Sequence, residues 1–167
     1  IWQTAPKSEA ARDALLLAGG IHLFLGRTSA GAAAFDRLHQ AFPKTAQSDS
    51  ARLALATHHL DHGRYEEAET AYGRAAKSIA DPEQAARARL GRADALRLGG
   101  RHSEALAEYD PLAQRPAGDS IREPARLGRA IALGQAGRFP PAVSLFLELV
   151  QTPSGGAPTS FSAAAVR

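Results

Sequence analysis

The chain has 167 residues, no cysteine and no methionine, and a net charge of +3 with basic and acidic residues interspersed. The lack of cysteine excludes disulfides and thiolate metal sites, and the mixed charges argue against the concentrated basic face of a nucleic-acid-binding protein. No apolar run is long enough to span a bilayer, so we expect no membrane insertion. Because residue 1 is isoleucine, we expect the sequence to be a fragment or a processed segment.

A Gly-Arg pair recurs along the chain at a constant interval of 37 residues, as Gly26-Arg27, Gly63-Arg64, Gly100-Arg101 and Gly137-Arg138. The residues around each pair keep the same spacing. An aromatic residue follows each glycine by nine positions, as Phe35, Tyr72, Tyr109 and Phe146. A constant period of this length indicates an array of structural repeats.

Each period reads as two helices. The first copy predicts helices near residues 8–24 and 28–41, and residues 1–7 read as a linker or a frayed start. The second copy predicts helices over 51–61 and 65–78, separated by Gly63, which can adopt the left-handed conformation that ends a helix. We expect Asp81-Pro82 to interrupt the helical pattern.

The third copy predicts helices near 86–98 and 102–114, and the fourth predicts helices over 123–135 and 139–151. This places the repeats at about 8–44, 45–82, 83–119 and 120–156. Residues 157–167 follow in the register of a further first helix, because Ala163 lies 37 residues after Arg126. They are the start of a fifth repeat or a capping helix, and we favour the repeat because the segment has no charged face.

The motifs resemble the tetratricopeptide repeat (TPR) superfamily over roughly residues 10–151. Residues 63–75 have the family's order of glycine, aromatic, acidic pair, alanine, aromatic and alanine, and the small residues of its two helices match Ala56 and Ala68 and their counterparts. The resemblance implies an all-α, right-handed solenoid of about four repeats whose first helices line a concave groove. It implies a protein partner, bound there as an extended or helical segment, and neither catalysis nor a cofactor.

The chain departs from the family pattern in three ways. The family period is about 34 residues, so the extra residues here lie between the repeats. Arg52, Arg89 and Arg126 occupy the position of an early tryptophan. The first copy has Thr28 and Gly31 in place of an aromatic residue and alanine. The turn over residues 41–45 is similar to turns of TPR proteins of the bacterial envelope, which suggests the periplasm as the location.

The positions that face the groove in the family give the predicted partner-binding residues. They are Leu16, Gly20 and Leu23 in the first copy, Leu53, Thr57, Leu60 and Asp61 in the second, Leu90, Asp94, Arg97 and Leu98 in the third, and Leu127, Ile131 and Gln135 in the fourth. The leucines would form an apolar line that suits a bound peptide or helix. Alternatively, they pack within their own repeats. The Lys and Asn pairs of the carboxylate-clamp TPR proteins are absent, so we expect no binding of that kind.

Two other sets of residues offer weaker sites. Arg52, Arg89 and Arg126 share one repeat position and could bind an acidic partner, although we favour ion pairs with nearby carboxylates. His58 and His62 lie four residues apart on one helical face and could bind zinc, but no third ligand is visible at a convincing spacing. We therefore expect no metal.

No nucleophile elbow and no glycine-rich phosphate loop occurs in the sequence. The sequence predicts a non-enzymatic adaptor that binds a partner protein in its groove. The alternative is a structural scaffold that self-assembles through the ends of the solenoid.

Overall fold

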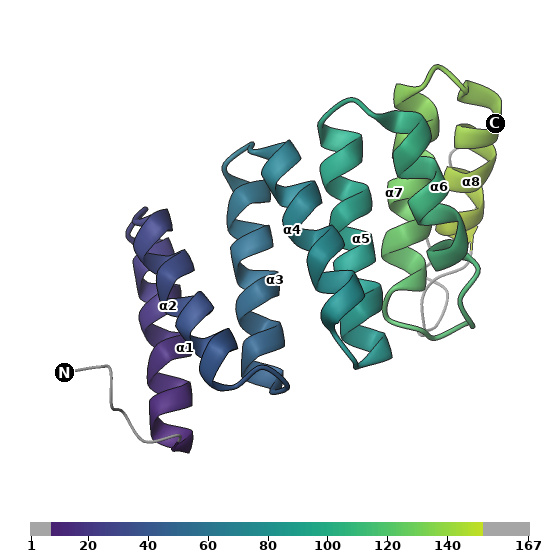
Figure 1. The fold of residues 1–167 in the computed structure, drawn as a ribbon. Helices are drawn as coiled ribbons and strands as arrows, with labels where there is room; N and C mark the ends of the chain where they lie inside the picture. The colour runs from purple at the N-terminus through teal and green to yellow at the C-terminus, as the bar shows by residue number, and fades with distance from the viewer. Residues whose placement is uncertain (1–7, 152–167) are drawn as a thin grey trace.

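The structure, a computed structural model, describes residues 8–151 and consists there of helices joined by short turns. The helices are α1 (Glu9–Phe24), α2 (Thr28–Ala41), α3 (Ala46–Asp61), α4 (Tyr65–Ser78), α5 (Pro82–Leu98), α6 (His102–Ala113), α7 (Arg122–Gln135) and α8 (Phe139–Gln151). The predicted all-α fold of helix pairs is confirmed, and the pairs follow one another in a single row (Figure 1). The expected linker at 1–7 and the expected further repeat or capping helix at 157–167 lie outside the described residues.

Helices α3 and α5 begin earlier than the sequence pattern predicted, at Ala46 and Pro82. Each has a side-chain cap. The Thr45 hydroxyl accepts a hydrogen bond from the Ser48 backbone N–H at 3.2 Å, and the Asp81 carboxylate accepts one from Gln84 at 2.9 Å. Pro82 occupies the first helical position, where a missing N–H leaves no bond unmade. Asp81-Pro82 thus interrupts the helical pattern after α4, as expected, and also starts α5.

The repeated Gly-Arg pair forms the turn between the two helices of each pair. Its glycines have φ values from +69° to +81°, a conformation that strongly favours glycine. The following arginine N–H bonds back to the helix, as in Arg64 to the His59 carbonyl at 2.9 Å and Arg101 to Leu96 at 2.9 Å. This is the hydrogen bond of the Schellman motif. The periodic signal in the sequence is thus a helix-ending signal.

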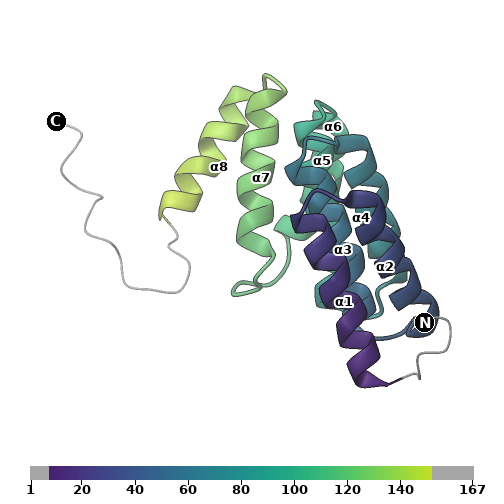
Figure 2. The same cartoon turned by 90° about the vertical axis from the view of Figure 1, so that its left-hand side faces the viewer.

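Contacts between helices reveal which side of the row is the inner one. Helix α1 contacts α3, α3 contacts α5 and α5 contacts α7, whereas within residues 8–151 the second helices of the pairs do not contact one another. Elements that touch on one side and separate on the other form a curved stack. Seen from its N-terminal end, the row has α1 and α3 on one side and α2 and α4 on the other (Figure 2). The concave side is therefore lined by the first helices.

The hydrophobic core is divided into three clusters. One lies in the first pair and α3 around Phe35 and Leu38, one around Tyr72, and one around Tyr109. Alanines fill much of the two later clusters, which lets the helices approach closely. Because a single pair cannot bury both of its faces, the packing between pairs supplies the rest of the core.

Candidate partner-binding groove

A tyrosine closes the second and the third junction between helix pairs. The ring of Tyr72 in α4 lies against Gly91 of α5, and the ring of Tyr109 in α6 lies against Gly128 of α7. A Cβ atom at Gly91 would come within 2.4 Å of the first ring, and one at Gly128 within 2.5 Å of the second. Ordinary carbon contacts are about 3.5–4 Å, so only glycine leaves room for the ring.

Residues predicted to line the groove hold these two phenols. The Tyr72 hydroxyl is 2.8 Å from the Thr57 hydroxyl, and the Tyr109 hydroxyl donates to the Asp94 carboxylate at 2.5 Å. Arg97 donates to the Tyr109 oxygen at 3.3 Å. Burial raises the pKa of both tyrosines, and the Asp94 charge raises the pKa of Tyr109 further. Both phenols therefore stay neutral, and their partners are engaged in closing the junctions.

The first junction is built differently. Phe35 occupies the repeat position of the tyrosines, but its ring lies against Gly19 of its own helix pair, where an added Cβ would be 2.1 Å from a ring carbon. The next first helix has Ala54 at the position of Gly91, so its methyl group occupies part of the space that a glycine leaves open. Gly20 stands at the position of Thr57 and offers no hydroxyl.

An apolar pocket of about 400 Å³ lies at this first junction. It is lined by the side of α1 that faces α3, by Phe35 of α2 and by Ala54 of α3, and the residues from α1 are Leu16, Leu17, Gly20, Ile21 and Phe24. Three of them are strongly exposed large hydrophobic residues, with Phe24 at 90%, Leu17 at 66% and Ile21 at 58% exposure. The pocket therefore offers apolar surface that the other junctions cover.

All predicted groove residues lie on the first helices of the pairs, α1, α3, α5 and α7, but they differ in exposure. Leu23 is buried in the core next to Gly31 and belongs to the packing of the first pair. The residues left exposed are Thr57, Asp61, Leu98, Leu127 and Gln135, with Gly20 beside them, and those half-buried are Leu16, Leu53, Leu60, Leu90, Asp94, Arg97 and Ile131.

The row of leucines has a mixed character. Leu16, Leu53 and Leu90 pack against the three core clusters, as the alternative interpretation expected, whereas Leu127 is 47% exposed. The prediction missed the pocket residues Leu17, Ile21, Phe24, Phe35 and Ala54. Phe24 had a visible signal, because it occupies the repeat position of Asp61, Leu98 and Gln135.

The arginines of the shared repeat positions are mostly paired within the chain. Arg52 pairs with Asp49 at 2.8 Å, and Arg126 pairs with Glu123 at 3.2 Å and Glu148 at 3.0 Å. Within residues 8–151, Arg89 has no ion pair. Only one free member remains, so the row does not present a continuous set of cations to a partner.

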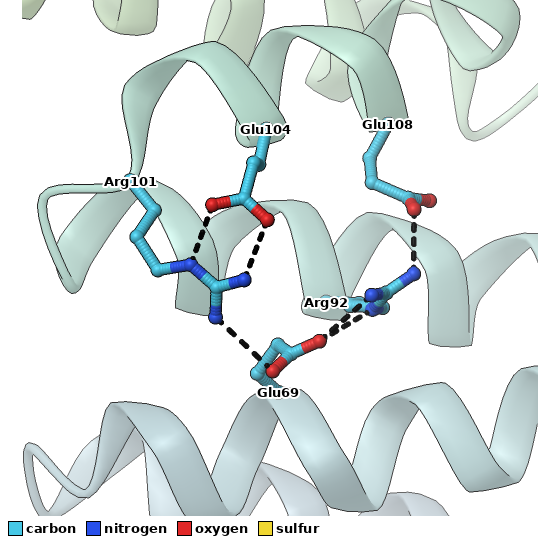
Figure 3. Close-up of polar contacts among 5 residues, drawn as sticks. All are labelled: Glu69, Arg92, Arg101, Glu104 and Glu108. Carbon is cyan, nitrogen blue, oxygen red and sulfur yellow. Dashed lines mark hydrogen bonds and ion pairs between the residues drawn. The ribbon is translucent and has the colours of Figure 1, made fainter.

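Arg92, one turn later, is the centre of the ion-pair network in Figure 3. It donates to Glu69 of α4 at 2.8 Å and to Glu108 of α6 at 2.6 Å. Arg101 joins Glu69 at 3.3 Å and Glu104 at 2.5 Å. Its hydrogen bonds lower the pKa of Glu104. The network connects the second and third helix pairs away from the groove.

The histidines take part in packing. The His58 ring nitrogen Nε2 is 2.9 Å from the Thr28 hydroxyl of the first pair, and the rings of His58 and His62 lie 4.1 Å apart. Burial, followed by the neighbouring cations, lowers the pKa of His58. Within the described residues, no three histidine, aspartate or glutamate side chains gather in a group able to hold a metal.

The fold defines the class of protein: an α-helical solenoid made of helix-pair repeats. Residues 53–120 match the family model described as tetratricopeptide repeat. This match supports the assignment of these repeats to the tetratricopeptide repeat superfamily, whose repeats are protein–protein interaction modules and generally not catalytic. The comparison with curated proteins and the comparison with solved structures found no match. Among the described residues, no helix combines the length and the apolarity that crossing a bilayer requires.

Proposed function

We propose that this protein is a non-enzymatic adaptor that binds a segment of a partner protein in the concave groove formed by α1, α3, α5 and α7. The observation that supports the proposal most strongly is the one-sided contact between first helices, which leaves a continuous inner face. That face has exposed apolar surface at both ends, at Phe24 and Leu127, with the carboxylate of Asp61 between them. An apolar surface with a few polar groups suits an extended or helical segment.

Affinity capture with a groove variant tests the proposal. Leu127→Glu combined with Asp61→Arg changes two exposed groove residues without touching the tyrosine contacts. Ala107→Glu, on the exposed side of α6, is the matched control. We expect a partner that the wild type and the control capture from a lysate of the native organism and that the groove variant loses while its helicity by circular dichroism is unchanged. Equal capture by all three baits would refute groove binding.

The turn over residues 41–45, which is similar to turns of envelope TPR proteins, makes the bacterial periplasm the first compartment in which to search for the partner. Fractionation of native cells with an antibody against the chain checks this location. Recovery of the protein in the cytosolic fraction alone would contradict it.

A second candidate function, self-assembly with another copy of this chain, is supported by α8. Its outer side exposes Phe139, Val143, Leu147 and Val150. Phe146 is 38% exposed, whereas its repeat counterparts Phe35, Tyr72 and Tyr109 are 5%, 6% and 0% exposed. Light scattering across protein concentration tests the association, with Leu147→Glu as the disrupting variant. A mass that stays at one chain would exclude it.

A further inference from the structure

We infer that the apolar pocket at the first junction is an anchor site for a phenylalanine-like side chain of a partner segment that also carries a basic residue nearby. Resting on the proposed function, this names the chemistry that the groove recognises at its N-terminal end. The pocket is apolar on all sides and its lining includes the three exposed residues Leu17, Ile21 and Phe24. A bound apolar group would remove this surface from water.

The repeats themselves indicate the shape of the occupant. In the second junction, the ring of Tyr72 fills the space between Thr57 of one first helix and Gly91 of the next. The ring of Tyr109 fills the same space between Asp94 and Gly128 in the third. The corresponding space in the first junction lies between Gly20 and Ala54, and both of these residues line the pocket.

Phe35 leaves that space open because its ring is seated on Gly19 instead. The pocket of about 400 Å³ that remains at the first junction is therefore available to a ring from outside, which would lie farther from Ala54 than the tyrosine rings lie from Gly91 and Gly128. The pocket continues the series of ring seats along the inner face of the solenoid, so a partner segment lying in the groove would pass over it.

The polar groups beside the ring determine whether tyrosine or phenylalanine is preferred at each junction. Thr57 and Asp94 bind the hydroxyl of a tyrosine in the later junctions, whereas Gly20 has no side chain to do so. The carbon and hydrogen surface of the pocket would leave a phenol hydroxyl without a partner, which is unfavourable. We therefore expect phenylalanine to bind more tightly than tyrosine.

The charge beside the pocket indicates the second feature of the partner. Asp61 is exposed and, within residues 8–151, accepts no hydrogen bond and forms no ion pair. It lies on α3 seven residues after the pocket residue Ala54, which is about 10 Å along the helix axis. Three residues of an extended peptide span a similar distance, about 10 Å. A basic residue three positions from the phenylalanine would reach this carboxylate.

Titration of the full chain with small peptides, followed by NMR of its ¹⁵N-labelled backbone, tests the inference. The probes are N-acetyl-Phe-Ala-Ala-Arg-amide, the reversed order N-acetyl-Arg-Ala-Ala-Phe-amide, and analogues of each with tyrosine or alanine for phenylalanine, or glutamine for arginine. We expect one order to shift the amides of Gly20 and Ala54, with the tyrosine analogue weaker and the alanine analogue inactive. Shifts centred elsewhere, or equal binding of the alanine analogue, would overturn the inference.

Gly20→Leu is the variant that fills the pocket. A side chain at Gly20 meets no atom within 4 Å of its Cβ, and leucine is the better helix former, so the variant should fold. Gly134→Leu is the matched control, because Gly134 of α7 is also helical and open but lies outside the pocket. We expect Gly20→Leu to weaken peptide binding about tenfold or more and the control to change it less than about twofold. Undiminished binding by Gly20→Leu would overturn the anchor site.

Asp61→Asn tests the basic residue separately. We expect it to abolish the advantage of the arginine peptide over the glutamine peptide, an advantage of about two- to fivefold at low salt for an exposed ion pair. An advantage that persists in Asp61→Asn would overturn the assignment of the carboxylate. Failure of the anchor site and failure of the adaptor function are distinguishable. A captured partner that Gly20→Leu still binds would refute the anchor site alone. Peptide binding without any captured partner would refute the adaptor function alone.

Discussion

Gly128→Ala is the substitution for which the structure makes the sharpest quantitative prediction. The new methyl group would lie 2.5 Å from a ring carbon of Tyr109, about 1 Å inside the normal contact distance. The ring is fully buried, and its hydroxyl donates to Asp94. Overpacking of this kind costs about 1–3 kcal/mol, and loss of a hydrogen bond to a charged group costs about 1.5–3 kcal/mol.

The helix propensity of alanine works in the opposite direction. Replacing glycine within a helix by alanine gains about 1 kcal/mol, so the expected net loss of stability for Gly128→Ala is about 1.5–5 kcal/mol. Gly134→Ala, on the same helix, is the control, because an added Cβ there meets no atom within 4 Å. We expect this control to be neutral or stabilising by up to about 1 kcal/mol.

Urea denaturation followed by circular dichroism measures the difference. Because repeat arrays can unfold in parts, hydrogen exchange of the α7 amides should locate the effect in the third junction. Tyr109→Leu in the Gly128→Ala background removes the ring that clashes, so the double variant should be more stable than the sum of the single changes predicts. Equal denaturation midpoints for Gly128→Ala and Gly134→Ala would refute the conclusion that Gly128 is needed to leave room for the Tyr109 ring.

Further predictions concern the histidine, the ion pairs and the second phenol. The pKa of His58 in the folded protein lies below the unfolded value of about 6.5, so the contribution of His58 to stability is complete above that pH and falls as the pH drops through the folded pKa. The loss of thermal stability between pH 7.5 and pH 5 should therefore be smaller in His58→Gln than in the wild type. Arg92→Met should cost about 1 kcal/mol at low salt and less at 1 M NaCl in urea titrations. Tyr72→Phe should destabilise less than Tyr109→Phe in the same assay. Tyr109→Phe removes the shared hydrogen-bond partner of the Asp94 carboxylate and the Arg97 guanidinium, whereas Tyr72→Phe removes only the partner of the Thr57 hydroxyl. An equal or reversed order in any of these pairs of measurements contradicts the corresponding contact.

The periodic residues were sufficient to predict the helix pairs because they report local backbone requirements. Gly63 and its counterparts end a helix through a positive φ, which is visible in the sequence as an invariant spacing. The sequence pattern predicts the beginnings of α3 and α5 too late, because Thr45 and Asp81-Pro82 are compatible with two different structural roles. The same residues end a helix or cap the next one, and which of these occurs depends on the packing of the residues that follow.

The pocket could not be predicted by repeat register alone. Register placed Phe35 at the same position as Tyr72, and the two rings nevertheless point to different neighbours. The difference depends on the small residues that surround each ring: Gly19 accepts Phe35, whereas Ala54 narrows the space that Gly91 leaves open in the next junction. Reading glycines as partners of aromatic rings, as well as helix-ending residues, would have drawn attention to Gly19 and Gly20.

The one-sided contacts between helices have a mechanical consequence. Along the inner edge α1, α3, α5 and α7 touch in succession, whereas along the outer edge no second helix of a pair touches another within residues 8–151. Successive helix pairs are therefore connected along the inner edge of the stack, while their second helices are separate along the outer edge. A change in its curvature rotates the pairs about the inner edge and breaks no contact between second helices. The stack should therefore bend most easily at the first junction, which has neither the tyrosine of the later junctions nor the Arg92 and Arg101 ion pairs of the second.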